Sequence, residues 1–122
     1  MPLSDADRPL YEVKANLFKG LAHPFRIRIL ELLSESAEVS VAQMLAETAL
    51  EPSHLSQHLA VLRRHRLVVS ERRGSNVFYR LAHPVTADML MVARQLLYEI
   101  LRDDQDRLAR AAALPDIGGT SR

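Results

Sequence analysis

The sequence predicts a mainly α-helical domain with one small β-hairpin, an α+β fold. Three observations predict it. Apolar residues recur at helical spacing along most of the chain, and two of the helices are separated only by a short break around Pro52. Between residues 67 and 81 β-branched and aromatic residues replace the helical period, which is typical of strands. We expect one domain over residues 9–112, flanked by disordered tails at residues 1–8 and 113–122.

Two helices are predicted at the start of the domain. Over residues 9–19 the apolar residues at helical spacing are Leu10, Val13, Leu17 and Phe18. Pro9 suits a first turn, and Gly20 can end the helix. A second helix begins near Pro24. Its apolar stripe, which we expect to face the core, consists of Ile27, Leu30 and Leu33.

The next two helices are short and closely spaced. Ser40 and Gln43 form a predicted capping box, so a third helix should cover residues 41–48. The chain then breaks before Pro52, and Ser53 is a good N-cap for a fourth helix that lasts to about His65. Its buried stripe comprises Leu55, Leu59 and Leu62. Two short helices joined by so tight a turn form a helix-turn-helix.

A hairpin and a long helix complete the predicted domain. The strands cover residues 67–72 and 76–81, with a turn at residues 73–75. The final helix runs over about residues 85–110. Its apolar stripe consists of Leu90, Ala93, Leu97, Ile100 and Leu101, widened by Met89, Val92 and Leu96. So wide a stripe on a terminal helix is more than one small domain easily covers.

Charge is distributed unevenly along the chain. Six arginines and one glutamate give residues 53–83 a net charge of +5, whereas the whole chain carries only +1, so the remainder carries −4. A basic block within a mildly acidic chain indicates an anionic partner, of which nucleic acid is the most common. A solvated charged surface is the alternative interpretation.

The fourth helix has a polar face opposite its leucines. At about 100° per residue that face contains Ser53, Gln57, Ala60 and Arg64, with Ser56 and Arg63 on one flank. Amide and hydroxyl groups can read base edges, arginine can bind guanine or phosphate, and a methyl group can contact thymine. We expect Ser56 and Gln57, together with His54, to contact bases. An ordinary solvated helix face is the alternative.

The hairpin also presents basic residues. Gly74 permits the positive φ that a tight hairpin often needs, and arginines near such a tip reach phosphates or a narrow minor groove. The residues of this predicted contact are Arg72, Arg73, Ser75, Asn76 and Arg80. Taken alone, these charges are also typical of a soluble edge strand.

Three segments together resemble the ArsR/SmtB group of bacterial winged-helix repressors: LAHPFRIRIL at residues 21–30, SHLSQHLAVL at residues 53–62, and RGSNVFYRL at residues 73–81. The resemblance implies a winged helix-turn-helix that represses transcription as a homodimer. It places the fourth helix in the major groove and the hairpin, or wing, against the DNA backbone or minor groove. It also implies pairing through the first and last helices, at Leu10, Val13, Leu17, Met89, Val92, Leu96, Leu97 and Ile100.

The chain departs from the metal-sensing members of that group. It has no cysteine, and Ser40-Val41-Ala42 stands where a Cys-Val-Cys type motif would lie. The approximate positions of a second family ligand cluster hold His83, Val85, Leu96 and Glu99, of which two are apolar. We therefore expect no metal and no cofactor. A metal sensor using His54, His58 or His83 with carboxylates remains an alternative.

Other classes of function find little support in the sequence. It has no Gly-rich phosphate loop, no cysteine nucleophile and no nucleophile elbow, so we expect no enzyme activity. No apolar run is long enough to cross a bilayer, and we expect a cytoplasmic protein. The expected partners are double-stranded operator DNA and a second copy, with no membrane, and no residue pattern identifies an effector. A winged-helix module that binds another protein is the remaining alternative.

Overall fold

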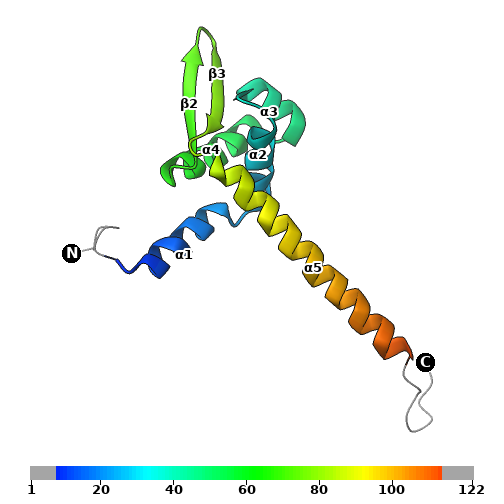
Figure 1. The fold of residues 1–122 in the computed structure, drawn as a ribbon. Helices are drawn as coiled ribbons and strands as arrows, with labels where there is room; N and C mark the ends of the chain where they lie inside the picture. The colour runs from blue at the N-terminus through cyan, green and yellow to red at the C-terminus, as the bar shows by residue number, and fades with distance from the viewer. Residues whose placement is uncertain (1–7, 114–122) are drawn as a thin grey trace. The chain divides into compact units, whose positions relative to one another are not determined.

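The computed structural model of the protein describes residues 8–113. Its elements follow the order α1 (Leu10–Leu21), α2 (Pro24–Glu35), β1 (Val39–Ser40), α3 (Val41–Thr48), α4 (Pro52–Arg64), β2 (Val68–Arg73), β3 (Asn76–Leu81) and α5 (Val85–Ala113) (Figure 1). The tails predicted at residues 1–8 and 113–122 lie outside the described residues, except Arg8 and the last helical residue, Ala113.

The chain divides into two compact units, Met1–Ala87 and Asp88–Arg122. Among the described residues, the first unit holds α1 to α4, the three strands and the start of α5. The second holds the remainder of α5, to Ala113. No described helix combines the length and apolar character that crossing a bilayer requires.

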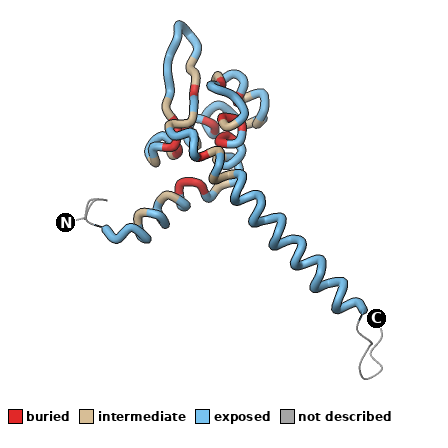
Figure 2. The backbone as a smooth tube through the Cα atoms, in the orientation of Figure 1, coloured by how far each residue is buried: buried red, intermediate tan, exposed pale blue. Residues whose placement is uncertain are grey.

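The core of the first unit is built from apolar residues of α2, α3, α4 and β2, and buried residues are coloured red along the backbone in Figure 2. The fully buried members are Ile29, Leu30, Leu33, Met44, Leu55, Leu62 and Val68. The predicted stripe of α4 is confirmed, since its three leucines are buried. The prediction for Ile27 is wrong, because this side chain is 37% exposed. The buried face of α2 is formed by Ile29, Leu30, Leu32 and Leu33, and Ile27 lies on the other side of the helix.

Helix α1 continues through the glycine that was expected to end it. Gly20 is helical and buried, and the helix ends one residue later, at Leu21. The reason for glycine here is close packing rather than termination. A Cβ built on Gly20 would lie 2.6 Å from Cγ of His65. Glycine therefore lets α1 approach the residue that caps the C-terminus of α4.

Side chains cap the starts of both α2 and α3. His23 is the N-cap of α2, and its Nδ1 accepts from the backbone N–H of Phe25 at 3.2 Å. The Ser40 hydroxyl accepts from the backbone N–H of Gln43 at 3.1 Å, and the Gln43 side chain accepts from the Ser40 N–H at 2.9 Å. The capping box is thus confirmed, and α3 covers the predicted residues.

Helix α4 begins slightly earlier than expected. Its N-cap is Glu51 and its first residue is Pro52, so Ser53 lies inside the first turn and is not the cap. Proline is favoured at the first helical position because its φ is already helical and its missing N–H would have no partner in the helix. His65 is the C-cap, and Arg66 adopts a positive φ of 60° as the chain turns toward β2.

The hairpin belongs to a sheet with one more strand than the sequence predicted. Strands β2 and β3 pair antiparallel and are joined by Gly74 and Ser75, with Gly74 at a φ of 64°. The additional strand is β1, whose two residues pair with Phe78 and Tyr79, so the sheet order is β1-β3-β2. Strand β1 leads directly into α3, so its pairing links the middle of β3 to the start of that helix.

Candidate nucleic-acid interface

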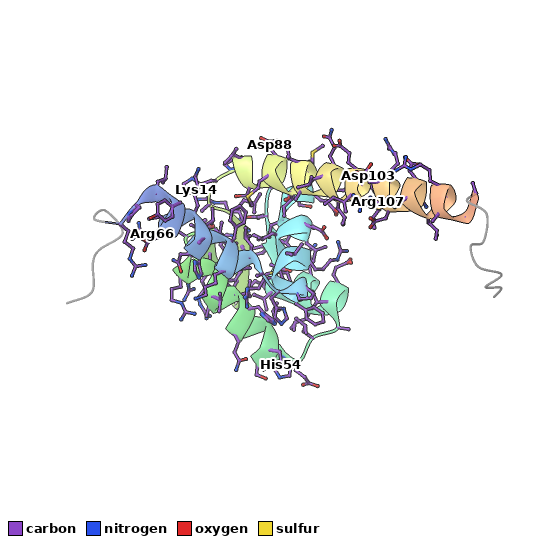
Figure 3. All side chains as sticks on the ribbon, turned by 90° about the horizontal axis from the view of Figure 1, so that it is seen from below. Lys14, His54, Arg66, Asp88, Asp103 and Arg107 are labelled. Carbon is purple, nitrogen blue, oxygen red and sulfur yellow. The ribbon has the colours of Figure 1, made fainter. Side chains whose placement is uncertain are left out.

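The residues predicted to form a recognition face lie on the solvent-exposed side of α4. Every residue assigned to it is exposed: Ser53, His54, Ser56, Gln57, Ala60, Arg63 and Arg64. The leucines of the same helix are buried, so α4 separates an apolar inner face from a polar and cationic outer face. Figure 3 shows His54 on α4 at the outer edge of the first unit. This face presents hydroxyl, amide, imidazole and guanidinium groups to solvent.

The C-terminal end of α4 is connected to the hairpin. Nη1 of Arg63 donates to the Ser70 hydroxyl of β2 at 3.3 Å. Among the described residues, no carboxylate lies within ion-pair distance of Arg63, Arg64 or Arg66. Their charges are therefore not neutralised inside the unit, and they are available to an anionic partner.

The hairpin extends from the helices as a two-stranded wing (Figure 1). All the residues predicted for it are exposed: Arg72, Arg73, Ser75, Asn76 and Arg80. Arg72 and Arg80 have no carboxylate at ion-pair distance within the described part of the chain. The basic block of the sequence therefore becomes two exposed surfaces, one on α4 and one on the wing.

Arg73 differs from the other wing arginines. Its Nη2 is paired with Glu38, which precedes β1, and its Nε lies 3.5 Å from a carboxylate oxygen of Glu71. The guanidinium also lies 3.9 Å from the centre of the Phe78 ring. The hydrogen bond to Glu38 raises the pKa of Arg73 above its ordinary value. A phosphate must therefore compete with Glu38 for the Arg73 guanidinium. The sequence analysis did not predict this ion pair.

The histidines of α4 have different surroundings. His54 is exposed, whereas His58 is half-buried, with its ring centre 4.3 Å from that of His23. Burial, followed by the charges of His23, Arg26 and His54, lowers the pKa of His58. In residues 8–113 no group of three or more histidines and carboxylates is arranged to hold a metal ion.

The residues expected in a dimer interface lie on two helices. On α1, Leu10 is 67% exposed, and Val13 and Leu17 are half-buried. The three line a shallow hollow with the segment that follows α4. On α5, the exposed members are Val92, Leu96, Leu97 and Ile100, whereas Met89 is half-buried. Each helix therefore presents aliphatic side chains that nothing within its own unit covers fully.

Comparisons with known proteins indicate the same class of function as this geometry. The family model for bacterial regulatory proteins of the arsR family matches residues 23–70. An HTH-type transcriptional regulator of Mycobacterium tuberculosis, Rv0081, is 47% identical over 116 residues, which cover 93% of this chain and 96% of the relative. The biofilm growth-associated repressor of Agrobacterium fabrum is 33% identical, covering 88% of this chain and 87% of the relative.

Solved structures share the fold. The crystal structure of M. tuberculosis Rv0081 matches with a TM-score of 0.73 and 48% identity, over 80% of this chain and 98% of that one. The solution structure of a homodimeric winged helix-turn-helix DNA-binding domain from Mycobacterium bovis matches with a TM-score of 0.70 and 28% identity. That match covers 83% of this chain and 93% of the other.

Proposed function

Since the chain belongs to the arsR family of bacterial regulatory proteins, we propose that it is a homodimeric repressor that places α4 in the major groove of operator DNA and the wing against the backbone or minor groove. It is a DNA-binding transcriptional regulator with a winged helix-turn-helix fold, and not an enzyme. The partner, the residues that read it and the mode of regulation are parts of the proposal.

The observation that carries the proposal is the division of α4 into two faces. A major groove admits a helix whose outer side chains can form hydrogen bonds to base edges, and Ser56 and Gln57 lie at the middle of the exposed face. Arg63 and Arg64 follow at its C-terminal end, where they can contact phosphates. On the wing, Arg72 and Arg80 are the cations without a carboxylate partner in the described residues.

Pairing through α1 and α5 would present this face twice. The aliphatic residues of the two helices are suited to an isologous two-fold interface, and the similar M. bovis domain is described as homodimeric. A two-fold dimer would place two α4 helices about 34–36 Å apart, so that they enter successive major grooves of a roughly palindromic site. Binding there would cover a promoter and repress it in the cytoplasm.

The proposal is tested by separating base contacts from phosphate contacts. The duplex is one that the protein selects from genomic fragments, and a scrambled duplex serves as the nonspecific probe. Gln57→Ala should lower the ratio of specific to nonspecific affinity, because an amide that reads a base contributes about 1–3 kcal/mol of discrimination. Arg72→Ala should weaken both probes similarly and reduce the slope of log Kobs against log salt by about 1 for each phosphate that the arginine binds.

The control variant is Arg107→Ala, which removes the same charge from an exposed position on α5. It should leave both the affinity and the salt slope nearly unchanged. With 6 to 10 phosphate contacts per dimer, wild-type affinity should fall by on the order of 10³- to 10⁵-fold between 50 and 200 mM salt. Weak binding that is insensitive to salt and to sequence would refute the proposal and favour a module that binds another protein.

A further inference from the structure

Arg26 of α2 connects the end of α1 to the middle of α4. Its Nε donates to the carbonyl oxygen of Gly20 at 2.7 Å, and its Nη2 lies 3.5 Å from the carbonyl oxygen of Lys19. These carbonyls belong to the last turn of α1. Its Nη1 lies 3.4 Å from Nδ1 of His58 on α4. A single guanidinium therefore contacts both helices.

A second contact between α1 and the end of α4 also involves Gly20. The His65 ring, at the C-cap of α4, packs so closely that a Cβ on Gly20 would come within 2.6–2.9 Å of three of its atoms. The residues Gly20, Arg26, His58 and His65 are called the α1–α4 joint below. The joint contacts α4 at two points, namely His58 in its middle and His65 at its end.

The hydrogen bond between Arg26 and His58 requires a neutral His58. Arginine can only donate, so Nδ1 of His58 must be the acceptor and its proton must lie on Nε2. The Arg26 guanidinium has neutral acceptors only, since no carboxylate of the described residues lies within ion-pair distance. Burial lowers the pKa of His58, which keeps the acceptor available at neutral pH.

We propose that Arg26 and His58 are positioning residues that set the direction of α1 relative to the recognition helix α4. The inference rests on the proposed function, in which α1 pairs the protomers and α4 enters the groove. If α1 belongs to the dimer interface, its direction relative to α4 determines where the two recognition helices lie. The joint would thereby link the geometry of the dimer interface to the distance between the two α4 helices that contact DNA.

Acidification should loosen the joint. The charged and titratable groups that face His58 are His23 at the N-cap of α2, Arg26 within α2, and His54 one turn earlier on α4. A protonated His58 would lose its acceptor nitrogen and place a cation beside Arg26. Lower pH adds positive charge to the protein, and positive charge by itself attracts phosphate. Weaker DNA binding at low pH is therefore opposite to what simple electrostatics predicts.

The first test needs no DNA. The chain has no cysteine, so Lys14→Cys on α1 and Ala60→Cys on α4 provide two unique sites for spin labels, both at exposed positions. Labelled chains are diluted into excess unlabelled protein, so that the measured distance is that within one chain. We expect one narrow distance distribution at neutral pH that broadens or shifts as the pH is lowered through the pKa of His58, which lies below the ordinary value of about 6.5.

Variants assign this change to the joint. Arg26→Met should broaden the distribution at neutral pH, whereas Arg28→Met, on the same helix, should not. Arg28 is exposed and its ion pairs, to Glu31 and Glu47, do not involve α1 or α4. His58→Asn should keep the distribution narrow at both pH values, because the asparagine oxygen is an acceptor that does not titrate in this range. A distribution that neither Arg26→Met nor acid alters would overturn the proposal.

A second measurement links the joint to DNA. Arg26→Met should weaken specific DNA binding by on the order of tenfold and leave the slope of log Kobs against log salt unchanged. An effect of this size is typical of mutations that contact neither of two coupled sites but alter the coupling between them. A slope reduced by about 1, with the spin-label distance as in the wild type, would show that Arg26 contacts phosphate directly and would overturn its positioning role. Absence of wild-type binding would refute the proposed function, and the spin-label result would still decide the proposal on the joint.

Discussion

Replacing Gly20 by alanine should destabilise the protein, although alanine is the better helix former. In an exposed helix interior the change gains about 1 kcal/mol. Here the new Cβ would lie 2.6 Å from Cγ, 2.7 Å from Cδ2 and 2.9 Å from Nδ1 of His65. Carbon atoms in optimal contact are about 3.5–4.0 Å apart, and overpacking of this kind costs about 1–3 kcal/mol. The net loss should be about 0–2 kcal/mol.

The loss should depend on the imidazole ring. In a His65→Ala background the methyl group of alanine at residue 20 meets no ring, so Gly20→Ala should stabilise the protein by about 1 kcal/mol. The coupling energy of the double-mutant cycle is then about 1–3 kcal/mol, the difference between the effects of Gly20→Ala in the two backgrounds. The free-energy cost of removing the His65 ring does not enter the coupling energy, because both proteins of the second background carry His65→Ala.

The assay is urea unfolding of the four proteins, followed by circular dichroism at one protein concentration. The concentration must be held constant because the stability of a dimer depends on it. Equal m values are required for the free energies to be compared. If Gly20→Ala changes the free energy of unfolding equally in both backgrounds, the ring does not restrict residue 20, and the close approach of α1 to α4 is refuted.

Three further predictions concern the interface, the wing and pH. Leu97→Glu should convert the proposed dimer into monomers by placing a charge among apolar side chains, whereas Gln95→Glu, on another side of α5, should not. Sedimentation velocity that shows an intact Leu97→Glu dimer would remove α5 from the interface. Glu38→Gln should release Arg73, which would strengthen DNA binding a few-fold and steepen its salt dependence. The control is Glu35→Gln, and unchanged binding in Glu38→Gln would mean that Arg73 contacts no phosphate. Because the pKa of His58 is lowered in the folded protein, its contribution to stability should be complete above about pH 6.5 and be lost as the pH falls through the lowered value. Urea unfolding from pH 8 to 5 should show this decline in the wild type and a smaller decline in His58→Asn.

Local capping and periodicity allowed most of the fold to be predicted. The range of α3 follows from Ser40 and Gln43, which satisfy each other's backbone groups without help from the rest of the chain. The start of α4 was predicted less well, because Ser53 is a good N-cap by residue type whereas Pro52 is compatible with helical φ and moves the cap to Glu51. Strand β1 was missed because two residues carry no alternating pattern.

The candidate site was predicted as far as it depends on helix periodicity. The leucines of α4 determine which side is buried, so the exposed polar residues follow from the sequence. The contacts that modify the site depend on residues far apart in the chain. Arg73 and Glu38 are 35 positions apart, and Arg26 and His58 are 32 apart. Gly20 packs against His65, which is still further away in the sequence, so a glycine that looked like a helix end is a packing site.

The measurement that tests the central claim most directly is a hydroxyl-radical footprint of the wild-type protein on the duplex it selects from genomic fragments. Two α4 helices in successive major grooves should protect two symmetric sets of nucleotides, with centres about 10–10.5 base pairs apart. A single protected set, or uniform protection without that repeat, would contradict the presentation of the recognition face by a two-fold dimer.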